Sequence, residues 1–250
     1  MEKLIRVRRK KKPVISIVIP TFNEEKYLEE TLLSLKWQNF SLPYEIIVSD
    51  SNSKDRTIEI AKKYVDKIVI TDRKGIAVGR NLGAKYAEGE YILFLDADTM
   101  LLPNALKEIY KEIKKRGVSL VSLPVLPSVF DITLIFYYLV YDLFSKNSIK
   151  IKKPQVAGML MCCKKKDFER IGGFNEEMKI VEDYDFSIRI GKIGKVKILN
   201  SSLAITSPRR LVKWGKLKGA TKYLLLYLGY LLGVKKISKE IGEVVYKPVR

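Results

Sequence analysis

Tyr91-Ile92-Leu93-Phe94-Leu95-Asp96-Ala97-Asp98 is an apolar run that ends in two aspartates. The apolar residues predict a buried strand, and a strand end is a rigid place from which to present charge. One carboxylate can hold a divalent ion while the other reaches a neighbouring group, and hard oxygen ligands of this kind suit Mg²⁺ or Mn²⁺. Such an ion would bridge to a diphosphate. The alternative is a solvated loop after a strand, and a second Asp-x-Asp pattern stands at Asp183-Tyr184-Asp185, so the surrounding sequence has to decide.

The composition predicts a folded protein with an anionic partner. With 250 residues, of which 47% are hydrophobic, the chain can bury the core of one large α/β domain or of two small ones. Its net charge of +19 arises from 47 Lys and Arg against 28 Asp and Glu. Such a charge favours nucleic acid, a membrane surface or phosphorylated small molecules, and it does not choose among them.

The absence of histidine from the sequence removes several kinds of chemistry. A histidine general base, a Ser-His-Asp triad and a histidine metal ligand are all excluded. The two cysteines, Cys162 and Cys163, are adjacent, so they form neither a disulfide framework nor a zinc site. Catalysis must therefore rely on carboxylates, lysines or a metal ion, and a reducing cytosolic setting fits the cysteines.

Strands and helices alternate along the first half of the chain. Helical periodicity is expected over 24–37, from about 55, after Gly79 and over 103–116, and the short apolar runs that predict strands lie at 14–19, 44–49, 67–71, 91–95 and 118–123. This alternation predicts a mostly parallel sheet, which binds its ligands at the carboxyl ends of the strands. Asp50, Asp96 and Asp98 all fall at such ends.

The second half of the chain continues the same domain. A strand is expected over 158–163, a short helix from Lys165 to Gly172, and a further helix that opens at Glu182. No internal repeat or low-complexity linker interrupts the pattern. We therefore expect a basic N-terminal tail (1–13), a single domain (14–206) with a nucleotide half (about 14–124) and an acceptor half (about 125–206), and a basic and apolar C-terminal appendage (207–250).

Five motifs occur in an order that resembles family 2 glycosyltransferases of the GT-A fold. They are Pro20-Thr21-Phe22-Asn23-Glu24-Glu25, Asp50 in a Ser/Asn turn, Gly79-Arg80-Asn81 with Gly83, Gly89-Glu90-Tyr91 leading to Asp96-Ala97-Asp98, and Gly172-Gly173-Phe174-Asn175-Glu176 followed by Glu182-Asp183. The resemblance spans roughly residues 14–190. It implies a single Rossmann-like α/β domain with a mostly parallel central sheet, to which C-terminal amphipathic helices are added.

The resemblance assigns a nucleotide pocket to the ends of the first two strands. Pro20, Thr21 and Glu24 would line it, and Asp50 would accept a hydrogen bond from a base edge, as a carboxylate can. Arg80 would hold the nucleotide or its phosphates. Two of these residues also have simpler explanations, because Glu24 can stabilise a helix N-terminus and Arg80 can lie on a solvated helix face.

The resemblance places the diphosphate of a nucleotide sugar beside the two aspartates of the opening motif. Asp96 would face the ribose, and Asp98 would ligate the Mg²⁺ or Mn²⁺ that neutralises the leaving diphosphate. Several relatives of this fold use a C-terminal histidine near the diphosphate, which this chain lacks. Arg209 and Arg210 stand in the comparable region and are expected to contact phosphate instead, because a guanidinium binds phosphate with two hydrogen bonds.

Asp183 is the expected catalytic base, by similarity to the Glu-Asp pair of the family. The aspartate would deprotonate the acceptor hydroxyl for in-line attack on the anomeric carbon, and a single displacement inverts the configuration. Glu182 and Asp185 could raise the pKa of Asp183 by like-charge repulsion. The alternative is that these acids only stabilise a helix N-terminus.

Two apolar segments predict a membrane-associated enzyme. Residues 130–144 are apolar nearly all round as a helix, and residues 211–234 are basic and then aromatic-aliphatic, an order suited to a membrane interface. The apolar stretches 129–144 and 223–234 are shorter than a transmembrane helix. We expect a peripheral enzyme on the cytoplasmic face of the membrane with a lipid-linked acceptor and no nucleic-acid partner, whereas a core or dimer helix is the alternative.

Three classes of function remain at this stage. The favoured one is an inverting, metal-dependent glycosyltransferase that uses a nucleotide-sugar donor and an acceptor hydroxyl or phosphate. A nucleotidyltransferase on a similar fold is the second, although no Gly-rich phosphate loop with a reactive lysine follows the first strand. The third, a non-catalytic membrane or nucleic-acid binding module, explains the charge but leaves the ordered carboxylates without a role.

Overall fold

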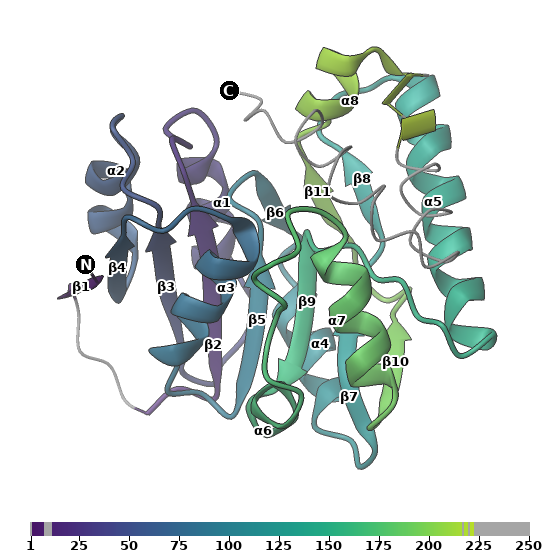
Figure 1. Cartoon of the computed structure of the whole chain (residues 1–250), viewed down its shortest axis with the longest axis horizontal. Coiled ribbons are helices and arrows are strands. Elements are labelled where there is room, and N and C mark those ends of the chain that lie inside the picture. The colour runs from purple at the N-terminus through teal and green to yellow at the C-terminus, as the bar shows by residue number, and fades with distance from the viewer. Residues whose placement is uncertain (1, 8–11, 217, 220, 223–250) are drawn as a thin grey trace.

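The computed structural model describes residues 2–7, 12–216, 218–219 and 221–222, and these contain two sheets. Figure 1 shows the larger sheet crossing the molecule, with the smaller one beside helices α5 and α8. The strands of the larger sheet, in spatial order, are β1 (Glu2–Arg6), β4 (Lys67–Thr71), β3 (Tyr44–Asp50), β2 (Ile15–Thr21), β5 (Tyr91–Leu95), β9 (Leu160–Lys164), β7 (Val118–Ser122) and β10 (Lys195–Ile198). The smaller sheet contains β6 (Thr99–Leu101), β11 (Ala204–Thr206) and β8 (Val125–Pro127).

Over the first half of the chain the helices alternate with the strands of the larger sheet, as the sequence predicts. The described helices are α1 (Leu28–Lys36), α2 (Thr57–Tyr64), α3 (Ile76–Lys85), α4 (Ala105–Ile113), α5 (Ile132–Lys150), α6 (Lys165–Arg170), α7 (Glu182–Gly191) and α8 (Arg209–Trp214). Only β1 and β9 run against the other strands of the larger sheet in the described part of the chain. The expected mostly parallel α/β sheet is therefore confirmed.

Two hydrophobic cores lie on the two faces of the larger sheet. Ile17 and Ile19 of β2 belong to the core that α1 and α4 cover, whereas Val18 between them belongs to the core that α3 and α7 cover. Successive side chains of a strand point to opposite faces, so a strand buried on both sides needs a continuous apolar run. This is why the central strands could be recognised from sequence.

Helix α3 lies unusually close to the sheet. A Cβ atom added at Gly83 would come 2.2 Å from Cγ1 of Val18, so only glycine allows this packing. The close approach brings the rest of α3, including Arg80, over the carboxyl ends of the strands.

The N-terminal residues differ from the expected basic tail over 1–13. Glu2–Arg6 form β1, which pairs antiparallel with β4 along its whole length. Leu4 and Ile5 pack against the two opposite cores. In the sequence these two apolar residues are hard to recognise as a strand, because charged residues surround them. A short, charged edge strand also discourages pairing with other chains.

Several element boundaries shift relative to the sequence predictions. Helix α1 begins at Leu28 instead of Glu24, because the amides of Tyr27 and Leu28 both donate to the Glu24 carbonyl in a preceding turn. Helix α5 runs on to Lys150, beyond the expected 130–144. Its N-cap is Asp131, whose side chain accepts a hydrogen bond from the amide of Leu134 at 3.0 Å.

The membrane question concerns α5 and the C-terminal segment. None of the described helices is long and apolar enough to cross a bilayer. Of the expected C-terminal amphipathic helices, α8 is described, whereas the apolar stretch 223–234 lies outside the described residues.

Candidate active site

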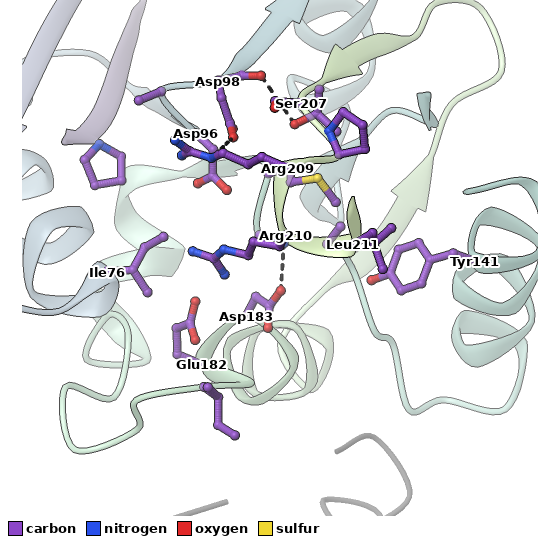
Figure 2. Close-up of a pocket in the computed structure, with 18 of the residues that line it drawn as sticks. Ile76, Asp96, Asp98, Tyr141, Glu182, Asp183, Ser207, Arg209, Arg210 and Leu211 are labelled. Atoms are coloured by element: carbon purple, nitrogen blue, oxygen red, sulfur yellow. Dashed lines mark hydrogen bonds and ion pairs between the residues drawn. The ribbon is translucent and has the colours of Figure 1, made fainter. Parts of the chain in front are cut away.

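A pocket opens at the carboxyl ends of β2 and β5, where α3, α5, α7 and α8 converge. Figure 2 shows Asp96, Asp98 and Arg209 on one side of it and Glu182 and Asp183 on the other, with the Arg210 side chain between them. The charged residues that line the pocket are Glu24, Arg80, Asp96, Asp98, Glu182, Asp183, Arg209 and Arg210. The structure therefore brings together most of the residues that the sequence predicts for the site, from segments that are far apart in the chain.

Arg80 forms the inner wall of the pocket. One terminal nitrogen of its guanidinium donates to Glu182 Oε1 at 2.9 Å, and the other donates to Asp96 Oδ1 at 3.1 Å and to the Gly158 carbonyl at 2.8 Å. The guanidinium carbon also lies 5.1 Å from the centre of the Phe174 ring. Because the side chain is only 1% exposed, Arg80 is neither on a solvated helix face nor free to wrap a phosphate. It orients the two carboxylates.

Asp183 lies in the first turn of α7 and faces the pocket. Its Oδ2 accepts the amide of Gly158 at 2.8 Å, and its Oδ1 accepts the amide of Tyr184 at 2.9 Å. Burial raises the pKa of Asp183, because removal of bulk water outweighs the attraction of Arg80. Burial and the adjacent Asp183 likewise raise the pKa of Glu182.

The residue before this turn has an uncommon backbone conformation. Val181 has a φ of 55°, in the left-handed region that β-branched residues rarely adopt. Conformations of this kind concentrate at functional sites, where the surrounding structure holds them. Here the left-handed residue turns the chain so that Glu182 and Asp183 enter the pocket together.

Arg209 forms the outer wall of the pocket with a second pair of carboxylates. Its two terminal nitrogens donate to the two oxygens of Glu24 at 2.7 and 2.8 Å, and its Nε lies 2.9 Å from Asp98 Oδ2. The guanidinium also lies over the Tyr27 ring, 4.7 Å from its centre. Figure 2 shows the Ser207 segment beside Asp98, whose carbonyl accepts the amide of Ser207 at 3.1 Å. Arg209 thus binds protein carboxylates at the place where the sequence predicts a phosphate contact.

Asp98 lies close to other carboxylates. Burial raises the pKa of Asp98 to about 6, and the carboxylates of Asp96 and Glu24 act in the same direction. The Arg209 guanidinium opposes this shift without cancelling it. A second cation beside Asp98 would be stabilised by the same cluster of negative charge.

Two of the predicted nucleotide residues do not line the pocket. The Asp50 carboxylate is fully buried, and it accepts hydrogen bonds from the Thr21 hydroxyl at 2.8 Å and from the Ser53 amide and hydroxyl at 2.7 and 2.6 Å. The Asp50 oxygens therefore order the turn after β3, and the expected contact of Asp50 with a base edge stays a prediction. Thr21 is buried with it, whereas Pro20 and Glu24 reach the pocket.

An aromatic lining was missed by the sequence analysis. Tyr137, Tyr138 and Tyr141 of α5 and Trp214 of α8 all line the pocket. Residues 130–144 were expected to lie in the core or to face lipid. The signal for a pocket lining was the spacing of the three tyrosines, because their hydroxyl groups are not well suited to a core or to lipid. The rings give this side of the pocket a surface on which sugars or apolar groups can pack.

The carboxylates fit a divalent ion whose other ligands are oxygens of water and phosphate. In the described ranges, no group of three His, Cys, Asp or Glu residues is arranged to hold a metal ion. Asp98 nevertheless offers a hard oxygen at the pocket, with Asp96 nearby. Mg²⁺ is commonly bound by one or two carboxylates and substrate phosphates, which is the donor set available here.

Comparison with known families defines the class of protein. The sequence model of glycosyl transferase family 2 matches residues 16–171. This is more than half of the chain, so the protein belongs to glycosyltransferase family 2. The resemblance seen in the sequence motifs is thereby confirmed.

Individual relatives agree with this assignment. Over 100 residues the chain is 38% identical to the poly(ribitol-phosphate) beta-N-acetylglucosaminyltransferase TarS of Staphylococcus aureus, covering 37% of this chain and 18% of that protein. S. aureus TarS 1–349 in complex with UDP-GlcNAc has a TM-score of 0.61 at 24% identity, covering 77% and 58% of the two chains. The mannosyltransferase PcManGT of Pyrobaculum calidifontis, in complex with GDP-Man and Mn²⁺, has a TM-score of 0.67 at 21% identity, covering 86% and 65%.

These structural likenesses show the fold. The chain has the GT-A architecture of its structural neighbours, as expected from the sequence. It spans less than two thirds of the length of both TarS and PcManGT.

Proposed function

We propose that this chain is an inverting glycosyltransferase that moves a sugar from a nucleoside-diphosphate donor to an acceptor hydroxyl. The observation that carries the proposal is the single pocket in which Asp183, Asp96 and Asp98 meet. Family membership supports sugar transfer, and the nucleotide-sugar complexes of TarS and PcManGT support the class of donor.

The acceptor is activated by Asp183. Its carboxylate takes the proton of the acceptor hydroxyl as the acceptor oxygen forms a bond to the anomeric carbon. The bond from that carbon to the diphosphate oxygen breaks, and the nucleoside diphosphate leaves with the electron pair. One displacement of this kind inverts the anomeric configuration. The amides of Gly158 and Tyr184 keep the Asp183 oxygens oriented, and the raised pKa makes this aspartate a stronger base than an exposed one.

The leaving diphosphate is stabilised at the other side of the pocket. A divalent ion held by Asp98, with Asp96 nearby, would neutralise its developing charge. The Mn²⁺ complex of PcManGT supports such an ion, and either Mg²⁺ or Mn²⁺ suits the carboxylates. Arg210, which extends into the pocket in Figure 2, is the proposed guanidinium contact for phosphate, together with Arg209 once it leaves Asp98.

Asp183→Asn tests the catalytic assignment, and Asp185→Asn is its matched control. Both aspartates lie in the first turn of α7, but Asp185 pairs with Arg189 and does not line the pocket. Asp183→Asn is expected to lower sugar transfer by about 10²–10⁴-fold, the range for loss of a general base, while nucleoside-diphosphate binding persists. Full transfer by Asp183→Asn, or an equal loss in Asp185→Asn, would remove Asp183 from this role.

The products separate this function from the alternatives. A thermal-shift panel of UDP-, GDP- and dTDP-sugars with and without Mn²⁺ selects the donor for the assay. Transfer with release of nucleoside diphosphate and an inverted anomeric centre by NMR supports the proposal. Release of inorganic diphosphate would indicate a nucleotidyltransferase, and no metal-dependent nucleotide binding would indicate a non-catalytic binding module.

A further inference from the structure

Helix α5 exposes a continuous apolar stripe, which we define as Ile132, Phe136, Leu139, Val140 and Leu143. These side chains are between 48% and 77% exposed. They recur at intervals of three and four residues, so they lie on one face of the helix. Leu134 and Tyr138, on the opposite face, are buried in the core. Exposed apolar surface arranged in a stripe, rather than scattered singly, marks a binding surface.

Basic residues lie at both ends of the α5 stripe. Lys150, Lys152 and Lys153 are exposed where the helix ends. At the other end, Lys216 pairs with Asp131, the N-cap of α5, and exposed Lys213 lies on the adjacent α8. The remaining acid of α5, Asp142, pairs with Lys146 at 2.5 Å. The stripe therefore lies between positive groups, and its two neighbouring acids are already neutralised.

We infer that the α5 stripe and its flanking lysines form a docking surface for an anionic lipid bilayer. An apolar helix face edged by lysines enters the headgroup region while the lysines contact anionic lipid, which gives an interfacial helix and not a spanning one. A second copy of the chain fits less well. In a face-to-face pair, lysines at the ends of one stripe would meet lysines of the other, and each chain carries a net charge of +19. The charge matches the anionic cytoplasmic leaflet.

The same helix joins this surface to the pocket. Tyr137 and Tyr141, on the side of α5 away from the stripe, line the pocket. A bilayer on the stripe would therefore lie one helix away from Asp183. An acceptor with an apolar tail in the bilayer would present its polar end to the pocket past these tyrosines. This step rests on the proposed function, whereas bilayer docking itself requires no catalysis.

Vesicle flotation of the 250-residue chain tests the docking surface. Phosphatidylcholine vesicles, with and without phosphatidylserine, are the probes at low salt. We expect flotation only with the anionic vesicles. The double variant Phe136→Ser, Leu143→Ser is expected to lower the partition coefficient by about tenfold or more, because two apolar side chains no longer enter the bilayer. Trp37→Ser, which removes a 75% exposed aromatic from the end of α1, is the matched control and should float as the wild type does.

The charge contribution has its own pair of variants. Lys152→Glu is expected to weaken binding to anionic vesicles by roughly fivefold or more. Lys62→Glu, an equally large charge change on the exposed face of α2, should leave binding nearly unchanged. Equal losses for the two lysines would mean that net charge alone, and not the α5 surface, drives the binding.

An environment-sensitive fluorophore on Phe136→Cys identifies what covers the stripe. The two natural cysteines, Cys162 and Cys163, are buried, so labelling is directed to residue 136. We expect water-like emission in solution and a blue shift when anionic vesicles are added. A blue shift before lipid is added would overturn the proposal, and light scattering would then show whether a second copy or the same chain covers the stripe.

The outcome is independent of the proposed enzyme function. Nucleoside-diphosphate binding and thermal unfolding of each variant are measured in parallel, and both should match the wild type. Absence of flotation with anionic vesicles overturns the docking proposal even if sugar transfer is intact. Loss of sugar transfer with normal flotation contradicts only the enzyme proposal.

Discussion

The two walls of the pocket use the same chemistry with different degrees of burial. In each, one arginine lies between two carboxylates: Arg80 between Glu182 and Asp96, and Arg209 between Glu24 and Asp98. The Arg80 side chain is 1% exposed and the Arg209 side chain 16% exposed. From this difference in burial we expect Arg80 to be the more firmly held of the two arginines.

The surroundings of the two arginines explain the difference. Arg80 lies on α3, which packs tightly on β2, and its partners are Asp96 directly after β5, Glu182 of α7 and the Gly158 carbonyl. Arg209 lies on the six-residue helix α8, near the end of the described chain. Removing one partner of a fully buried ion pair leaves an uncompensated charge, and this cost falls as the pair becomes more exposed to water. We therefore expect Arg80 to maintain the site and Arg209 to change partners.

Arg80→Met gives the largest expected effect. Glu182 would remain buried, and Asp96 partly buried, without their shared cation, which lowers the free energy of unfolding by about 3–5 kcal/mol. Urea denaturation measures the loss. Arg73→Met is the control, because Arg73 is 59% exposed and pairs with Glu176 at the surface, so its change should stay within about 0.5 kcal/mol. A similar small change in Arg80→Met would show that burial does not distinguish the two walls.

The pH dependence of transfer is the second expected effect. Because burial raises the pKa of Asp183, its base form is lost as pH falls through a value above that of an ordinary aspartate. Below that value kcat/KM should fall about tenfold per pH unit. The control Asp185→Asn should keep the same profile. A rate that stays constant down to the ordinary aspartate range would contradict the raised pKa.

Arg209→Met is expected to strengthen divalent-ion binding. In the donor-free protein Arg209 competes with the ion for Asp98. Because the two side chains are only 16% and 12% exposed, the gain in ion affinity should exceed the roughly fivefold change, about 1 kcal/mol, that is the upper value for a surface pair. Calorimetric titration with Mn²⁺, without donor, measures it. Asp98→Asn should abolish the binding. Weaker Mn²⁺ binding by Arg209→Met would mean that Arg209 supports the ion site instead of competing for it.

The smallest expected effect concerns the backbone at Val181. Val181→Gly relieves the left-handed conformation of a β-branched residue but adds flexibility to the unfolded chain, so the net gain in unfolding free energy is about 0.5 kcal/mol. Thermal unfolding measures it. Val212→Gly, in helix α8 without a positive φ, should instead be destabilising. A loss of stability in Val181→Gly would show that the valine side chain outweighs the backbone strain.

Much of the fold could be predicted because the signals are local. The central strands are apolar runs, and α4 and α7 begin within a few residues of their predicted starts. Strand β1 was missed because its apolar pair, Leu4 and Ile5, stands among charged residues and only becomes meaningful beside β4. Edge pairing is a contact between segments that are distant in sequence, and no local pattern specifies it.

The sequence predicted which residues lie at the site better than it predicted what each of them does. Asp96, Asp98 and Asp183 do meet in one pocket, as expected for strand ends and a helix N-terminus at the same edge of a parallel sheet. Asp50 follows the same kind of strand end, but its carboxylate turns inward to Thr21 and Ser53. Which way such a carboxylate points depends on the donors nearest to it, and these come from neighbouring turns.

The sequence by itself determined the family, the alternating α/β order, the exclusion of histidine chemistry and the set of charged residues available for the site. These depend on residue identity and spacing, which the chain carries directly. Only the tertiary structure decided that Arg80 is buried between Glu182 and Asp96, that Arg209 holds Asp98, and that one side of α5 is exposed while the other lines the pocket. Burial and ion pairing are properties of segments brought together by folding, and they convert similar residues into groups with different roles.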